Sequence, residues 1–193
     1  MGNVLLESFC ERKGTKIKNR FGVIGLGQYG NKIADLFASL KDDNDRPFYE
    51  TVAINSFIGD FTHLKNIPQK RKIGLKGIED GCGRNPELAK EALVNKKENQ
   101  QLLFESFDHI KDSDVFLVAG GMGGGTATGI ITMTIKALNR TINGPLIEER
   151  KRPKAIGAII TLPLASAPAN EKRNALIALT ELENLMNDKA SNL

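Results

Sequence analysis

Short apolar runs alternate with amphipathic stretches along most of this chain. Four runs are short, apolar and rich in β-branched residues, as is typical of strands buried on both faces. They span residues 21–24, 51–55, 114–119 and 155–162. The other stretches carry apolar residues at helical spacing and predict helices over 31–40, 85–94, 98–107, 129–139 and 171–186. Strands that alternate with helices predict an α/β fold, a Rossmann-like three-layer domain with a mostly parallel sheet and helices on both faces.

The segments between the predicted strands and helices are expected to be irregular, and the polar segments at either end are expected to lie outside the domain. The irregular segments are a charged loop over 41–47, a loop around a short helix within 56–80, and a surface excursion over 141–153. The expected organisation is an N-terminal arm (1–19), one domain (20–187) and a tail (188–193). Asn85-Pro86-Glu87 marks a helix start, because the Asn side chain can cap the helix and Pro fits its first position.

The most informative stretch is Gly120–Gly129, in which glycine fills six of ten positions. It follows the predicted strand at 114–119 and precedes the predicted helix at 129–139. In this arrangement, bare backbone N–H groups and a helix N-terminus can meet an anion. Glycine suits such a loop because a Cβ would block the close approach of the backbone to phosphate. The pattern therefore favours a phosphate-binding loop over a flexible linker.

Composition narrows the function classes. The net charge of +4 is small, and basic clusters such as 70–72 are typical of solvated surface. With no Trp and two Tyr, the chain offers no stacking platform, so direct contact with nucleic acid is not expected. Cys10 and Cys82 have neither disulfide-framework nor metal-site spacing, and no apolar run is long enough to span a membrane. We therefore expect a cytoplasmic protein that does not bind membranes.

The first strand is followed by Gly25-Leu26-Gly27-Gln28-Tyr29-Gly30, which matches the dinucleotide fingerprint G-x-G-x-x-G. An NAD-dependent enzyme would also need an acid at the end of the second strand to hold the ribose 2′-hydroxyl. That strand ends in Asn55, so the acid is missing. The second glycine loop also has no role in a simple dinucleotide fold. A nicotinamide-dependent Rossmann enzyme is therefore kept only as an alternative.

Four segments together resemble the nucleotide loops of the tubulin/FtsZ superfamily. Residues 27–33 (GQYGNKI) resemble the first nucleotide loop of tubulins, and residues 123–129 (GGGTATG) resemble the signature GGGTG[ST]G. Residues 81–87 (GCGRNPE) are similar to the FtsZ loop GAGxNPE. Within the superfamily, Arg84-Asn85-Pro86 and residues 161–163 (TLP) are most like the plasmid and phage TubZ branch. The motifs occur in the family's order and span the predicted domain.

The resemblance implies a nucleotide site built from several loops, with GTP or GDP and Mg²⁺ as ligands. Gly27, Gln28 and Tyr29 would lie along the α- and β-phosphates. Gln28 would be near the waters of a Mg²⁺ that the phosphates hold, so no residue of the chain would ligate the metal directly. The main phosphate cradle would consist of Gly121, Gly123, Gly124, Gly125, Thr126, Ala127 and Thr128.

The other implied contacts come from separate loops. Gly81, Gly83 and Arg84 would sense the γ-phosphate, although a solvated loop position is an equally simple role for Arg84. Asn55 would sit at the edge of the site. Glu171 and Asn174, in the first turn of the last predicted helix, would contact the ribose hydroxyls.

Two departures from the family pattern affect these expectations. Ala127 replaces a signature glycine, which would cost about 1 kcal/mol if that position needs a positive φ. The chain is also expected to lack the family's last strands, its central helix and its C-terminal domain. Catalytic acids would come from the missing loop of a neighbouring subunit, so no catalytic residue is expected in this chain.

The resemblance implies a parent protein that is a GTPase and polymerises head to tail into filaments. Relatives of the TubZ branch act in plasmid or phage DNA segregation, which implies self-association and a DNA-binding adaptor as a possible partner. This chain alone would bind nucleotide without hydrolysing it. A non-polymerising regulatory paralogue that binds nucleotide is the alternative, and Ala127 and the missing C-terminal half are the observations that support it.

Overall fold

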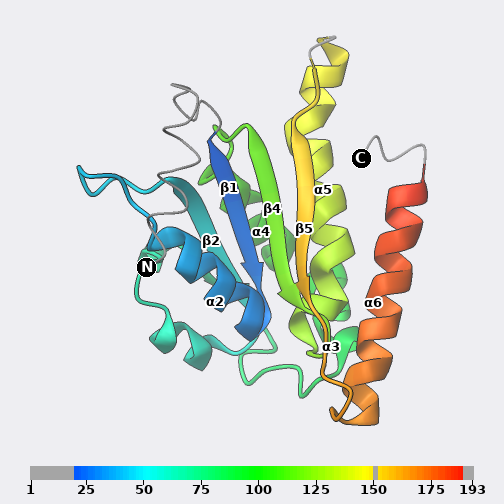
Figure 1. Ribbon diagram of the computed structural model, residues 1–193. Coiled ribbons are helices and arrows are strands. Elements are labelled where there is room, and N and C mark those ends of the chain that lie inside the picture. The colour runs from blue at the N-terminus through cyan, green and yellow to red at the C-terminus, as the bar shows by residue number, and fades with distance from the viewer. Residues whose placement is uncertain (1–19, 150–151, 189–193) are drawn as a thin grey trace.

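The computed structural model of the protein describes residues 20–149 and 152–188. Within them, five strands form one sheet with every pairing parallel, in the order β3-β2-β1-β4-β5 (Figure 1). The strands are β1 (Phe21–Leu26), β2 (Tyr49–Asn55), β3 (Lys72–Gly74), β4 (Val115–Gly121) and β5 (Ala155–Thr161). The helices are α2 (Gly27–Ala38), α3 (Pro86–Asn95), α4 (Lys97–Asp108), α5 (Thr126–Glu148) and α6 (Ala169–Asn187), with the short 3-10 helices η1 (Ile58–His63) and η2 (Gln69–Arg71).

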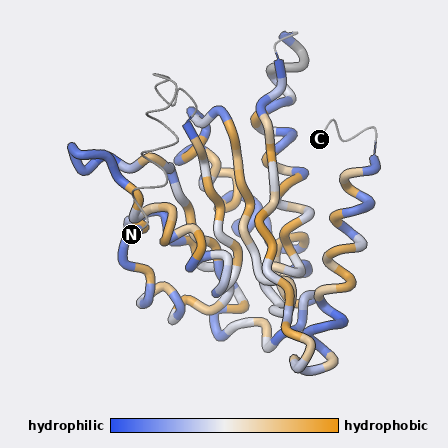
Figure 2. Tube along the Cα trace, in the orientation of Figure 1, coloured by the Kyte–Doolittle hydropathy of each residue, from blue (hydrophilic) through white to orange (hydrophobic). Residues whose placement is uncertain are grey.

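Alternating side chains along the strands build a core on each face of the sheet. On one face, Val23 and Ala53 pack with Ala34 of α2. On the other, Ile24 of β1 belongs to the larger cluster with Ile130 of α5. Figure 2 shows the matching pattern, with apolar residues along the strands and along parts of the helices. The predicted three-layer α/β architecture is confirmed.

The order of the strands creates a crevice at one end of the sheet. β1 and β4 are neighbours, and from this central pair the chain proceeds to β2 on one side and to β5 on the other. The two connecting helices, α2 and α5, begin directly at the carboxyl ends of these strands or a few residues later. Ligands of open parallel sheets bind at such a point, where the direction of winding reverses.

Several elements differ from the sequence-based expectation. α2 begins at Gly27 rather than at residue 31, so two of the three fingerprint glycines, Gly27 and Gly30, lie in its first turn, and Gly25 lies in β1. Gly30 permits this because a Cβ there would lie 2.1 Å from the Ala119 carbonyl oxygen. The short strand β3 was not predicted, because its three residues, Lys72–Gly74, carry no alternating pattern.

The predicted surface excursion over 141–153 is wrong for its first half. α5 continues through Pro145 to Glu148, well past its predicted end at 139. The buried Asn143 anchors this extension, because its side chain accepts from the Lys154 N–H (2.8 Å) and donates to the Lys154 carbonyl (3.0 Å). The helix is therefore fixed to the start of β5 by a polar contact. The spacing of apolar residues in the sequence could not predict this contact.

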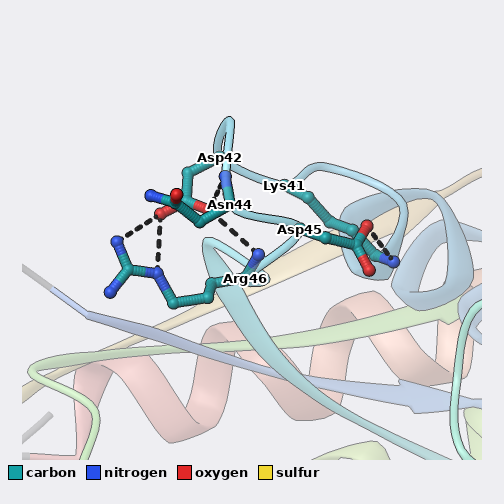
Figure 3. A network of polar contacts seen from close by, with 5 residues as sticks. All are labelled: Lys41, Asp42, Asn44, Asp45 and Arg46. Carbon is teal, nitrogen blue, oxygen red and sulfur yellow. Dashed lines mark hydrogen bonds and ion pairs between the residues drawn. The ribbon is translucent and has the colours of Figure 1, made fainter.

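The charged loop before β2 is confirmed and is held by its own side chains (Figure 3). The Asp42 carboxylate accepts from the backbone N–H groups of Asn44 and Arg46, both at 2.9 Å, and from the Arg46 guanidinium. Lys41 pairs with Asp45 at 2.8 Å. Turns are commonly closed by an aspartate whose side chain accepts hydrogen bonds from backbone N–H groups a few residues later in the chain.

Asp35 of α2 holds the segment that follows η1. Its carboxylate accepts from the backbone N–H groups of residues 65, 66 and 67 at 2.8–3.1 Å. Partial burial acts to raise the pKa of Asp35, but these hydrogen bonds outweigh it and hold the pKa below its ordinary value of 3.8. The stabilisation is therefore present above about pH 4 and is lost as the pH falls through the lowered pKa.

Asp35→Asn is expected to lower the free energy of unfolding at pH 7 by about 1 kcal/mol, a discounted value because the carboxylate is partly exposed to water. Urea unfolding at pH 7 and at pH 3 would measure the difference from the unchanged protein. We expect it to shrink at pH 3, because the stabilisation declines once the pH is below the ordinary pKa of the carboxyl group. Asp43→Asn, at an exposed position of the neighbouring loop, is the matched control. Equal effects of the two variants would contradict the anchoring role of Asp35.

Candidate functional site

A cavity of about 850 Å³ lies at the carboxyl ends of β1, β2, β4 and β5. Its lining takes in the turn after β1, the segment after β2, the loop before α3, the glycine loop after β4 and the segment between β5 and α6. All of the sequence-predicted contact residues line it except Thr128 and Asn174. Segments far apart in the sequence therefore meet at the crevice between β1 and β4.

Two helix N-termini converge on this cavity. Gly27 begins α2 and Thr126 begins α5, and both residues line the cavity. No side chain caps α2, and neither helix has an acidic residue in its first turn. The first N–H groups of a helix have no partner within the helix and carry a partial positive charge. The floor of the cavity is therefore suited to an anion with several oxygens.

The glycines of the loop after β4 serve two different purposes. A Cβ added to Gly125 would lie 2.7 Å from the Cβ of Cys82, and one added to Gly129 would lie 2.2 Å from the Pro86 carbonyl oxygen. These two glycines let α5 approach the loop before α3 and the start of α3. Gly124 is different, because its nearest neighbour would be the Gly121 oxygen at 3.7 Å, and it lines the cavity. The space beside Gly124 is therefore part of the cavity and is not filled by another segment of the protein.

Ala127 carries no backbone strain. It lies in the first turn of α5, and its φ is not positive. Its methyl group is 3% exposed and packs beside Gly27 and Gly120. The condition under which alanine would cost stability here is therefore not met. One of the two observations behind the non-polymerising alternative no longer supports it.

The loop before α3 adopts an unusual backbone. Gly81 and Gly83 have φ of 96° and 52°, and Arg84 has φ of 63°, a left-handed conformation that is costly for a residue with a side chain. The Arg84 guanidinium pairs with the Glu171 carboxylate at 3.2 Å. Asn85 caps α3 by accepting from the Glu87 N–H at 3.1 Å, as its sequence position predicts. Ion pairing and capping thus hold a strained loop at the rim of the cavity.

The two predicted residues outside the lining are both engaged in the loops themselves. The Thr128 hydroxyl donates to the Met122 carbonyl at 2.8 Å and is buried. The Asn174 side chain donates to the Arg84 carbonyl (2.8 Å) and, at 3.3 Å, to the Gly123 carbonyl. Asn174 therefore ties the glycine loop to the loop before α3. Apolar and motif patterns gave no signal for this bridging position.

Asp60 of η1 is a cavity residue that the sequence analysis missed. Its carboxylate accepts from the Asn55 side chain at 2.8 Å and from the Gln28 side chain at 3.3 Å. Asn55 also accepts from the Ser56 N–H at 2.9 Å, which orients its amide toward Asp60. The available signal was an acid shortly after a strand that ends in polar residues, but segment 56–80 was interpreted only as a loop around a short helix.

Ser56, Cys82 and Thr126 form a polar, uncharged part of the cavity wall. The hydroxyls of Ser56 and Thr126 lie 2.7 Å apart, and the Cys82 thiol lies 3.8 Å from the Thr126 hydroxyl. Among the described residues, no group of three or more His, Cys, Asp or Glu side chains could hold a metal ion by itself. Any cation here would need the ligand's own oxygens. Separately, no helix within the described part of the chain is long and apolar enough to cross a membrane.

Comparisons with known proteins agree with this arrangement. The model of the tubulin/FtsZ family, GTPase domain, matches residues 20–188. The tubulin-like protein TubZ of Bacillus thuringiensis subsp. israelensis is 33% identical over 185 residues, 90% of this chain and 36% of TubZ. The tubulin-like protein CetZ of Pyrococcus abyssi (strain GE5 / Orsay) is 35% identical over 173 residues, 85% of this chain and 41% of CetZ.

The fold is also found in solved structures. A GTPγS-form protofilament of TubZ from Bacillus thuringiensis serovar israelensis superposes with a TM-score of 0.71 and 30% identity, over 91% of this chain and 44% of that one. The chain thus spans less than half the length of each of these relatives. The family model covers all of the residues that the structure describes. The chain belongs to the tubulin/FtsZ family, and residues 20–188 match its GTPase domain.

Proposed function

We propose that the cavity binds a guanine nucleotide, GTP or GDP, together with Mg²⁺. The observation that carries this proposal is the convergence of two helix N-termini and a glycine loop on one cavity. The phosphates would lie over the N-termini of α2 and α5, against Gly123–Thr126. The rim residues Arg84 and Glu171 would lie toward the γ-phosphate and the sugar. Gly81 and Gly83 give their loop the shape that brings Arg84 to the rim.

Mg²⁺ fits the residues present. This cation favours oxygen ligands and usually keeps several waters, with one or two carboxylates and the substrate's phosphates. Asp60 supplies one carboxylate inside the cavity, and Gln28 and Asn55 hold it in place. When bound, the ion would neutralise phosphate charge. This extends the sequence-based expectation, which placed only Gln28 near the metal waters.

For the longer proteins that carry this domain, we propose GTP hydrolysis at a head-to-tail junction between subunits. The support is the relation to TubZ, one of whose structures is a GTPγS-form protofilament. Acids supplied by the next subunit would orient the attacking water, since phosphoryl transfer depends mainly on positioning and charge stabilisation. This chain alone would bind nucleotide without hydrolysing it. A cytoplasmic role in plasmid or phage DNA segregation, with a DNA-binding adaptor, is the corresponding proposal for the cell.

An amide NMR titration tests the binding step directly. Mg·GTP is expected to shift the signals of residues 25–31, 81–85 and 120–129, and GDP is expected to shift fewer signals at 81–85. ATP and NAD are the comparison ligands. Shifts with NAD alone would favour the dinucleotide enzyme, and unchanged signals in all three loops would overturn the proposed site for this chain.

Asp60→Asn tests the metal contribution separately. The substitution keeps the size of the side chain but removes its charge and one of the two oxygens that accept from Asn55 and Gln28. We expect GTP affinity to fall about tenfold in Mg²⁺, equivalent to about 1.4 kcal/mol, and to stay the same or rise in EDTA. Calorimetric titrations in both buffers would measure this. Asp80→Asn, which removes another cavity carboxylate, is the control. A loss of equal size in EDTA would show that Asp60 acts on the fold rather than through the metal.

A further inference from the structure

A second, smaller cavity lies at the β3 edge of the sheet and shares no lining residue with the candidate nucleotide site. It has a volume of about 310 Å³ and forms a groove between the edge strand β3 and the helix α4. All three residues of β3 line one wall. Leu102 and Ser106 of α4 and His109, the residue directly after α4, line the other, at spacings that place them on one side of the helix.

The backbone of β3 is available for pairing on its outer side. Among the residues that the structure describes, β3 is the last strand of the sheet and pairs only with β2. The Leu75 N–H donates to the Asn55 carbonyl at 2.8 Å. Because successive residues of a strand point their backbone groups to opposite sides, the N–H and C=O groups of Gly74 are directed away from β2. An extended segment placed in the groove could exchange hydrogen bonds with Gly74.

The groove is rich in positive charge. Lys70, Lys72 and Lys76 line it, against one carboxylate, that of Glu105. Lys72 donates to the Phe61 and Leu64 carbonyls at 3.3 and 2.8 Å, so its ammonium group is already engaged. Among the described residues, Lys70 and Lys76 form no ion pair and are exposed. Two cations therefore flank the free backbone of Gly74.

The positive charge around the groove also affects the pKa of His109. Its partial burial, and after that the charges of Arg71 and Lys70, lower the pKa of the imidazole. The ring is therefore neutral near pH 7, and a neutral ring leaves the positive charge of the groove to the lysines. Leu102 and Ile73 add an apolar surface between the charges. The groove thus combines backbone, apolar and cationic contacts.

We propose that this groove binds an extended acidic peptide segment of a partner protein, which adds to β3 as a further strand. In strand addition, main-chain hydrogen bonds supply affinity and the flanking side chains supply specificity. The lysines match alternating carboxylates on the added strand. They also repel a basic edge strand, which protects the free edge from pairing with a partner of that charge. This site is independent of the proposed nucleotide function.

Fluorescence anisotropy with a labelled peptide of alternating Val and Glu residues tests the proposal. The same peptide with Lys in place of Glu is expected not to bind. A version with N-methyl groups on alternate backbone nitrogens is expected to bind at least about tenfold more weakly, equivalent to about 1.4 kcal/mol, because it cannot donate to β3. Hydrogen exchange at the Gly74 amide is expected to slow when the unmodified peptide is bound.

The double variant Lys70→Glu/Lys76→Glu is expected to lose binding of the acidic peptide. Lys136→Glu/Arg140→Glu, two exposed positions of α5 outside the groove, makes the same change in net charge and is expected to retain it. Circular dichroism of both variants checks that they fold. Equal binding by both variants, or equal binding of the N-methylated peptide, would overturn strand addition in this groove. Tighter binding of a single-stranded oligonucleotide, lost in Lys70→Glu/Lys76→Glu, would assign the groove to nucleic acid instead.

Discussion

Replacing Gly124 with valine is expected to abolish measurable nucleotide binding while the protein remains folded. Gly124 lines the cavity, and a Cβ at this position meets no atom of the protein closer than 3.7 Å. The fold therefore has room for the new side chain. The ligand does not, because a branched side chain would occupy the space in which phosphate approaches the loop backbone. We expect affinity for GTP to fall at least about 100-fold, equivalent to about 2.7 kcal/mol.

Calorimetric or NMR titration with Mg·GTP measures the effect, and thermal unfolding without nucleotide checks the fold. Gly144→Val is the matched control, because Gly144 lies in α5 with no atom within 4 Å of an added Cβ and does not line the cavity. It should leave both affinity and stability nearly unchanged. Wild-type affinity in a folded Gly124→Val protein would show that this loop does not hold the phosphates.

Gly30→Ala, in contrast to Gly124→Val, is expected to lower the stability of the fold strongly, although it adds only a single methyl group. An added Cβ would lie 2.1 Å from the Ala119 carbonyl oxygen and 3.1 Å from the Gly120 Cα. Both contacts are with backbone, so no side chain can move aside. α2 would have to move away from β4, and the packing of Ala34 beneath it would be lost. We expect a loss of about 3 kcal/mol, which lowers the melting temperature by about 6–12 °C.

Differential scanning calorimetry without nucleotide measures this loss. Gly144→Ala provides the comparison, since alanine in an open helical position is expected to be neutral or slightly stabilising. A Gly30→Ala protein with an unchanged melting temperature would mean that α2 can shift at little cost. The two glycine variants together separate the glycines that accommodate ligand from those that accommodate the protein's own backbone.

The sequence predicted the central fold because burial on both sides of a parallel strand leaves a strong local pattern. β1, β2, β4 and β5 were all placed within a few residues. β3 was missed because three residues at a sheet edge, two of them Lys72 and Gly74, carry no apolar signal. The end of α5 was missed because the Asn143 side chain fixes it through hydrogen bonds with the Lys154 backbone. A polar contact of this kind leaves no hydrophobic pattern in the sequence.

The sequence predicted those parts of the candidate site that contain glycine-rich loops. The turn after β1, the loop before α3 and the loop after β4 were found from their glycines, and all three line the cavity. Asp60 was not found, because its position follows from the path of η1 across the end of β2 rather than from any spacing. The bridging contacts of Asn174 were likewise out of reach, since their partners are backbone carbonyls.

The central position of β1 also sets the order in which this protein can fold during synthesis. Among the strands that the structure describes, β1 is made first, yet one of its two neighbours is β4, with Phe21 opposite Val115. At a synthesis rate of about 5–20 residues per second, β1 waits several seconds for that neighbour. Until then its free edge is exposed, and pairings between distant strands are slow to form. The nascent chain therefore passes through a period in which one edge of β1 has no partner, and the cavity is completed only after the segment between β5 and α6 has been made.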